Sequence, residues 1–281
     1  MSERKKNKNK SLRLLYILLA ISLVGVLTFG VWIGIDFFLD WQSQNHYVAL
    51  AASIETRPRG PQSRPAISPV NNPNSNDEHE GSSLGASVEE EQEPWEPYAD
   101  FDELSERFPG IIGWIKLDGT AINYPIMQWT DNYYFLGHLP DGTRHRSGSI
   151  FMDYRNTRDF SDKNTILYGH ESRTDDMFGA LKHFRNQEFY DAHQIIYIHT
   201  PLSDYQLVIF TAYLVDSGVE VPRMDFRDDE HFADYIRDIR GRSFFSSGVE
   251  VSVEDRIVTL ATCAYDFVNA RLVVVGKLVS F

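Results

Sequence analysis

The residues that suggest chemistry lie near the end of the chain. Cys263 is the only cysteine in 281 residues, and it follows an apolar run, 257–260, that is typical of a buried strand. Arg271 opens a second run of the same kind. If these runs form adjacent strands, a thiol and a guanidinium lie near each other at one end of a sheet. A thiolate beside a fixed positive charge is a nucleophile with a lowered pKa, so the group still required is a base.

His170 is the best candidate for that base. It follows a third strand-like run, 164–168, and Gly169 leaves room for close approach of the backbone. An imidazole can protonate a departing amine and then deprotonate an incoming one. For a lone cysteine outside the cell, three roles are open: an intermolecular disulfide, a buried small hydrophobe or a reactive thiol. The position of Cys263 after Thr262 at a strand end, with Arg271 close behind, favours the reactive thiol.

Two motifs resemble those of a known family. The run Thr-Leu-Ala-Thr-Cys ending at Cys263, with a downstream arginine, and the run Tyr-Gly-His ending at His170 are similar to motifs of the sortase cysteine transpeptidases. Segments 263–274 and 122–126 resemble class B sortases in particular, and the resemblance spans 98–281. It implies that Cys263 is the nucleophile and His170 the acid and base. Arg271 then donates hydrogen bonds to the oxyanion or to the substrate backbone.

The same resemblance suggests substrate contacts. Segment 131–136 is similar to the class B segment in which an asparagine and a leucine line the groove for the sorting signal, which implies Asn132 and Leu136. The alternatives are that Asn132 caps a short helix and that Leu136 belongs to the core. Thr262 either offers its backbone N–H or hydroxyl near the oxyanion, or packs against the next strand.

No metal or cofactor is predicted. His170 and Glu171 begin like the zinc motif H-E-x-x-H, but its fifth position is Thr174, so the second histidine ligand is missing. A single cysteine forms no C-x-x-C pair, and the sequence holds no glycine-rich phosphate loop.

The elements that must position these residues are mainly strands. A helix is expected over 101–108, after a capping box at Asp100 and Glu103. Two further helical stripes cover 175–184 and 229–240, the second in the connection between the sixth and seventh strands. The eight expected strands are 111–117, 120–127, 149–154, 165–168, 195–200, 205–215, 256–262 and 272–279. The predicted fold is therefore mostly β, an eight-stranded sortase-like barrel with an N-terminal helix, preceded by a single transmembrane helix.

The N-terminus reads as a membrane anchor. Residues 14–35 carry no charge, and 22 residues at about 1.5 Å each span a hydrocarbon core of roughly 30 Å. Residues 1–13 carry six basic groups and one acidic group, so we expect a cytoplasmic tail and an extracellular remainder. A cleaved signal peptide has a shorter apolar region, which favours a signal anchor. The tail has a net charge of +5 and the whole chain has a net charge of −13, so the remainder of the chain has a net charge of −18. Such a negative charge argues against nucleic acid as a partner.

A proline-rich, acidic segment separates this anchor from the predicted barrel. Seven prolines fall between residues 58 and 97, and 77–96 holds eight acidic residues and no basic one, a composition typical of disorder. The predicted organisation is a basic cytoplasmic tail (1–13), a transmembrane signal anchor (14–35), a juxtamembrane segment with a disordered linker (36–97) and a catalytic domain (98–281).

The resemblance implies a function at the cell surface. It predicts a transpeptidase, in a Gram-positive bacterium, that cleaves a C-terminal sorting signal of secreted proteins after threonine. A thioester forms, and the protein is then transferred to an amino group of peptidoglycan. The alternatives are a pilin-polymerising sortase, a hydrolytic cysteine peptidase, and a non-catalytic, membrane-tethered barrel that binds wall components. The acidic linker could also serve as a lid over the site.

Overall fold

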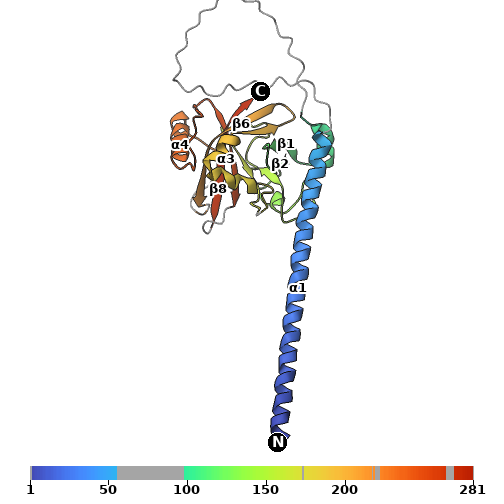
Figure 1. The fold of residues 1–281 in the computed structure, drawn as a ribbon. Helices are drawn as coiled ribbons and strands as arrows, with labels where there is room; N and C mark the ends of the chain where they lie inside the picture. The colour runs from blue at the N-terminus through green and yellow to red at the C-terminus, as the bar shows by residue number, and fades with distance from the viewer. Residues whose placement is uncertain are drawn as a thin grey trace, which may run out of the picture. The chain divides into compact units, whose positions relative to one another are not determined.

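The computed structural model describes residues 2–55, 98–172, 174–216, 218, 222–263 and 269–280 (Figure 1). Its helices and short 3-10 helices are α1 Ser2–Glu55, α2 Phe101–Arg107, η1 Tyr134–Leu136, η2 Gly179–Arg185, α3 Gln187–Ala192 and α4 Asp229–Gly241. Its strands are β1 Ile111–Lys116, β2 Asn123–Met127, β3 Ile150–Met152, β4 Asn164–Tyr168, β5 Ile195–His199, β6 Asp204–Asp216, β7 Arg256–Cys263 and β8 Ala270–Ser280.

The eight strands close into a barrel in the order β1-β2-β3-β4-β7-β8-β6-β5. The pairs β2/β3 and β4/β7 are parallel, and the other neighbours are antiparallel. All eight strands expected from the sequence are therefore confirmed, and β2 and β3 are each three residues shorter than expected. Each described strand has a paired neighbour on both sides, so the barrel holds its strand ends in fixed relative positions.

The helix before the barrel is also confirmed. The Asp100 side chain accepts a hydrogen bond from the backbone N–H of Glu103 at 2.9 Å, which is the expected N-cap. Phe101 and Leu104 are buried on one face, and the helix ends before Pro109. This amphipathic turn leads directly into β1.

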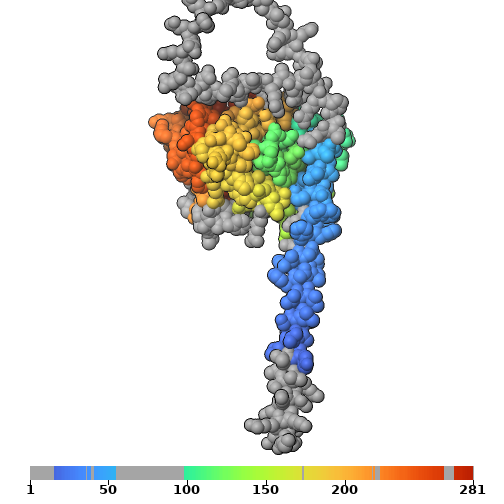
Figure 2. All heavy atoms as spheres, in the orientation of Figure 1, coloured from blue at the N-terminus to red at the C-terminus, as the bar shows by residue number. Residues whose placement is uncertain are grey.

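The helix expected over 175–184 is wrong in both its start and its type. The segment begins as a loop in which Asp175 and Met177 have positive φ angles of 63° and 54°, and only from Gly179 does it form a 3-10 helix. The Asp175 carboxylate accepts from Lys182 Nζ at 2.5 Å and lies 2.8 Å from His183 Nε2, which holds the loop against η2. The apolar stripe nevertheless faces the core as expected. Figure 2 shows the residues around η2 and α3, in yellow, over much of the visible face of the barrel domain.

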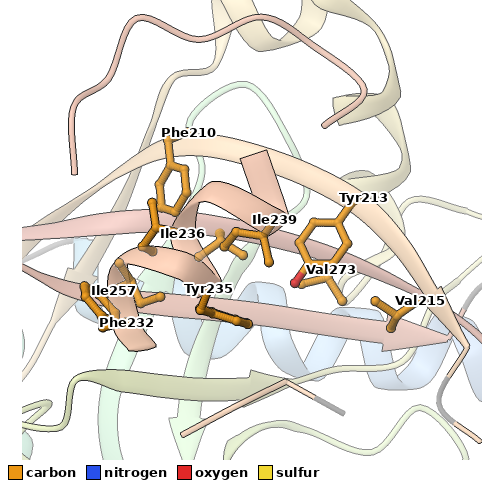
Figure 3. Packing of buried hydrophobic residues seen from close by; sticks show 10 residues of the cluster. Phe210, Tyr213, Val215, Phe232, Tyr235, Ile236, Ile239, Ile257 and Val273 are labelled. Carbon is orange, nitrogen blue, oxygen red and sulfur yellow. The ribbon is translucent and has the colours of Figure 1, made fainter. Parts of the chain in front are cut away.

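Helix α4 packs on the outer face of β6, β7 and β8 (Figure 3). The Thr211 hydroxyl donates to the Ile239 carbonyl at 2.9 Å, which ties the helix to β6. Four residues of the predicted stripe are buried in one cluster with residues of the strands: Phe232, Tyr235, Ile236 and Ile239 from α4, Phe210, Tyr213 and Val215 from β6, Ile257 from β7, and Val273 and Val275 from β8. The helix between the sixth and seventh strands is thus confirmed, and it braces the strands that carry Cys263 and Arg271.

The barrel begins with an aromatic contact. The ring of Tyr98 stacks on the ring of His199 with centroids 3.8 Å apart, and His199 Nδ1 lies 2.9 Å from Asp204 Oδ1. His199 ends β5 and Asp204 begins β6, so the first described residues of the domain lie at the start of β6.

The N-terminal unit consists of the long helix α1. Its stretch Tyr16–Ile35 has a mean hydropathy of 2.3 and exposed side chains, and it is the one described helix that is long and apolar enough to cross a membrane. The helix continues beyond this stretch to Glu55. The greater part of the predicted linker, 56–97, lies outside the described residues, so the boundaries of the anchor, linker and catalytic domain stay predictions.

Candidate active site

The parallel pairing of β4 and β7 brings their ends together. Tyr168, the last residue of β4, is paired with Ala261, and the Gly169 N–H donates to the Ala261 carbonyl at 3.2 Å. His170 follows Gly169, and Cys263 is the last residue of β7. The expected nucleophile and the expected general acid and base therefore leave neighbouring strands at the same end of the barrel.

The antiparallel pairing of β7 and β8 adds the third residue. Cys263 and Arg271 are directly opposite each other in this ladder. Residues 264–268, including Asp266, and the side chain of Cys263 lie outside what the structure describes. At the level of the backbone, the barrel brings together the three residues that the sequence proposed for catalysis.

His170 is held through its ring. Its Nε2 lies 2.8 Å from the carbonyl oxygen of Leu136. A carbonyl only accepts, so Nε2 carries the hydrogen in this arrangement, and Nδ1 is the ring atom that holds the lone pair of the neutral imidazole. Its backbone carbonyl accepts from the Phe178 N–H at 3.1 Å. The histidine is thus fixed on two sides, by Leu136 from an earlier segment and by Phe178 from the loop that follows it.

Gly169 allows this approach. A Cβ at this position would lie 2.5 Å from Ile150 Cδ1 and 2.7 Å from the ring of Phe178. Both neighbours belong to the packed interior, so the glycine that precedes the histidine is required by space. This agrees with the close backbone approach expected from the sequence.

Asn132 is held by its side-chain amide. Its Nδ2 donates to Asp153 Oδ2 at 2.9 Å, and its Oδ1 accepts from the backbone N–H of Tyr154 at 3.0 Å. The alternative in which Asn132 caps a short helix is wrong, because Asp131 accepts from the N–H groups of Tyr133 and Tyr134 instead. These backbone hydrogen bonds lower the pKa of Asp131. Among the described residues, one amide N–H and one lone pair of Asn132 have no hydrogen-bond partner and remain for a ligand.

Leu136 is 39% exposed, which contradicts the alternative that it is a core residue. It ends η1, and its carbonyl is the acceptor for His170. An exposed apolar side chain on a residue whose backbone touches the candidate base fits the position of a substrate contact.

Thr262 is 1% exposed and pairs with Leu272. Its hydroxyl is buried and has no hydrogen-bond partner among the described residues. Burial favours the packing role over direct contact of the hydroxyl with a substrate.

Sequence reasoning missed Asp153, and it gave Tyr168 no role beyond its place in the Tyr-Gly-His run. The Asp153 carboxylate accepts from Arg155 Nε and Nη2 at 2.9 and 2.8 Å, and from the Tyr168 hydroxyl at 3.1 Å. Burial alone raises the pKa of Asp153, but the hydrogen bonds from Arg155 and Asn132 outweigh it and leave the pKa below its usual range. An isolated Asp after an apolar run carries no motif, so nothing in the sequence marks it.

The charge of Arg271 also affects the pKa of the Tyr168 hydroxyl. Burial and the Asp153 carboxylate raise the pKa of the Tyr168 hydroxyl, while the positive charges of Arg155 and Arg271 oppose this change. The guanidinium of Arg271 therefore acts electrostatically at the end of β4, across β7.

Comparison with known proteins agrees with this geometry. Residues 115–279 match the family model described as the sortase domain. The chain is 39% identical over 181 residues to sortase B of Staphylococcus aureus, which covers 64% of this chain and 74% of that protein. It is 38% identical over 172 residues to sortase B of Listeria monocytogenes, which covers 60% and 70%.

Solved structures show the same likeness. A Staphylococcus aureus sortase B–substrate complex matches with a TM-score of 0.61 and 37% identity, over 64% of this chain and 84% of that one. Sortase B of Clostridium perfringens matches with a TM-score of 0.60 and 35% identity, over 64% and 99%. The chain belongs to the sortase family, and it is a cysteine transpeptidase related to sortase B proteins.

Proposed function

We propose that the chain cleaves the C-terminal sorting signal of secreted proteins after a threonine and joins them to an amino group of peptidoglycan. The observation that carries this proposal is the strand register. It puts Cys263 opposite Arg271 and beside the end of β4, where His170 follows, in a chain of the sortase family. This family membership argues against the non-catalytic wall-binding barrel.

In the first step the Cys263 thiolate attacks the carbonyl carbon of the threonine. The tetrahedral oxyanion accepts hydrogen bonds from the Arg271 guanidinium, a planar donor that keeps its charge. The C–N bond then breaks, and the leaving amine takes a proton from His170, which gives a thioester.

In the second step an amino group attacks the thioester. His170 takes a proton from the incoming amine, the C–S bond breaks, and the thiolate of Cys263 is restored. The product carries a new amide bond, so the number of peptide bonds is unchanged. Water in place of the amine gives hydrolysis, the reaction of the alternative peptidase.

Substrate contacts are proposed for Asn132 and Leu136. Support comes from their position: Asn132 retains one N–H and one acceptor site, and Leu136 is exposed beside the atom that holds His170. The S. aureus relative was solved as a substrate complex, which supports a sorting-signal protein as the partner.

For localisation we propose a single-pass signal anchor with the N-terminus in the cytoplasm and the barrel outside. Support comes from the apolar stretch Tyr16–Ile35 and from the basic residues that precede it. At the membrane surface the enzyme would meet both a secreted protein and a lipid-linked acceptor.

The test is to trap the acyl-enzyme. The protein is incubated with a panel of pentapeptides containing threonine at the fourth position and analysed by mass spectrometry, with and without an amine acceptor. We expect an adduct on Cys263 that an amine converts to a ligated product. Failure to form an adduct with any peptide, or full turnover by Cys263→Ala, contradicts the proposal. Free acid as the product even with amine present indicates the peptidase.

A further inference from the structure

Asp153 is a buried carboxylate that accepts an unusual number of hydrogen bonds. It follows β3, and its side chain has 0% exposure. Oδ1 accepts from the backbone N–H and Nε of Arg155 at 3.0 and 2.9 Å. Oδ2 accepts from Arg155 Nη2, Asn132 Nδ2 and the Tyr168 hydroxyl at 2.8, 2.9 and 3.1 Å.

Two of these donors belong to the segments that hold His170. Tyr168 ends β4, two residues before the histidine. Asn132 lies in the segment 131–136, whose last carbonyl, that of Leu136, accepts from His170 Nε2. The Asp153 carboxylate therefore links the end of β4, from which His170 follows, to the segment 131–136, whose Leu136 carbonyl holds the imidazole ring.

An ionised aspartate is the group that suits this position. All five contacts come from donors, and only an ionised carboxylate accepts at both oxygens and donates nothing. An asparagine in its place must turn an NH2 group toward donors, so at least one of the contacts from Arg155, Asn132 or Tyr168 is lost.

We propose that Asp153 is a positioning residue for acyl transfer, which acts through Tyr168 and Asn132 to keep His170 in register with Cys263 and does not itself touch the substrate. This rests on the role given to His170 under the proposed function. Displacement of a catalytic group by about 1 Å is enough to cost on the order of 100-fold in rate.

The test compares two buried aspartates, each next to a basic side chain, in the full-length chain. Asp153→Asn is measured beside Asp204→Asn, a matched control in which the carboxylate is 2% exposed and paired with His199 at the start of β6. We expect Asp153→Asn to lower kcat for peptide transfer by ~10- to 100-fold. Both variants are assayed at the same number of degrees below their own Tm. Under these conditions Asp204→Asn should keep kcat within about twofold of wild type.

A cycle with Tyr168→Phe separates positioning from general destabilisation. Tyr168→Phe removes the hydroxyl that donates to Asp153 and keeps the ring. If Asp153 acts through Tyr168, the double variant loses less activity than the product of the two single losses. If Asp153→Asn does not fold, Tyr168→Phe decides alone: a lowered kcat at unchanged Tm supports positioning, and wild-type kcat overturns it.

The outcomes also separate this inference from the proposed function. If His170→Ala is inactive while Asp153→Asn loses no more kcat than Asp204→Asn, the positioning role is wrong and the function stands. If His170→Ala keeps full activity, both are wrong.

Discussion

His170 donates from Nε2 to a backbone carbonyl, and this leaves a definite atom for the chemistry. With Nε2 protonated, Nδ1 is the nitrogen that exchanges a proton with the amine in the neutral tautomer. The Leu136 carbonyl also stabilises the imidazolium that forms after the proton is taken up, because both ring nitrogens are then donors. The contact is therefore compatible with both protonation states that the proposed mechanism requires.

Arg271 gives the first prediction. Arg271→Lys should lower kcat by about 100-fold, the usual cost of removing one oxyanion donor, because a point charge does not replace a planar fork. The measurement is steady-state transfer of a soluble peptide. Arg256→Lys is the matched control. Arg256 is the first residue of β7, at the opposite end of the β7–β8 pair from Cys263, and it donates to the Phe160 carbonyl. Equal activity of the two lysine variants contradicts the oxyanion role.

Asp153 gives a prediction about pH and stability. Its pKa in the folded protein lies below the unfolded value of about 3.9, so the ionised carboxylate stabilises the fold above that value. This contribution is lost as the pH falls from about 4 through the lower, folded pKa. Urea unfolding at several pH values should show wild type more stable than Asp153→Asn above about pH 5, and the difference should shrink below pH 4. A difference independent of pH contradicts the assignment.

At the scale of the element, the turn from β4 to His170 depends on Gly169. Gly169→Ala places a Cβ against Ile150 and Phe178, and such overpacking costs about 1–3 kcal/mol. Because His170 is the next residue, we expect kcat to fall together with Tm. Gly241→Ala is the control, since nothing lies within 4 Å of its added Cβ at the end of α4. A Gly169→Ala variant with wild-type Tm and kcat shows that this packing is not required.

Helix α4 should stabilise the strands that carry the site. Ile239 is fully buried against β6 and β8, and Ile239→Ala is expected to cost about 2–5 kcal/mol in the free energy of unfolding. The exposed Arg237 on the same helix is the comparison, and Arg237→Ala should stay within about 0.5 kcal/mol. Chemical denaturation measures both. Equal effects would mean that the helix contributes little to the core.

The strands, and the placement of Cys263, His170 and Arg271 at one end of the barrel, could be predicted from the sequence, because apolar runs mark strands and the motifs mark strand ends. The first part of the segment 175–184 could not. Its stripe reads as a helix, but the positive φ angles of Asp175 and Met177 depend on contacts with η2 and with the hydroxyl of Tyr124, which donor and acceptor types alone do not reveal. Asp153 was missed for the same reason, since its partners lie at 132, 155 and 168.

For the whole molecule, the barrel has its own closed sheet and core, and α1 carries the membrane-length stretch. The full chain should therefore sediment with membranes and resist carbonate extraction. Residues 98–281 expressed alone should stay in the supernatant and still transfer soluble peptides. Immunoblotting of fractions and a peptide assay check both parts. Release of the full chain by carbonate contradicts the signal anchor.

The stacking of Tyr98 on His199 has a mechanical consequence. This contact lies at the start of β6, whereas Arg271 faces Val215, eleven residues further along that strand, a path of about 36 Å at roughly 3.3 Å per residue. Through this stacking, a force on the chain at Tyr98 acts on the β5–β6 hairpin. The hydrogen bonds between β6 and β8 then distribute that force. A load applied at the N-terminal end of this domain therefore acts at the end of β6 opposite the end where β7 and β8 bring Cys263 and Arg271 together.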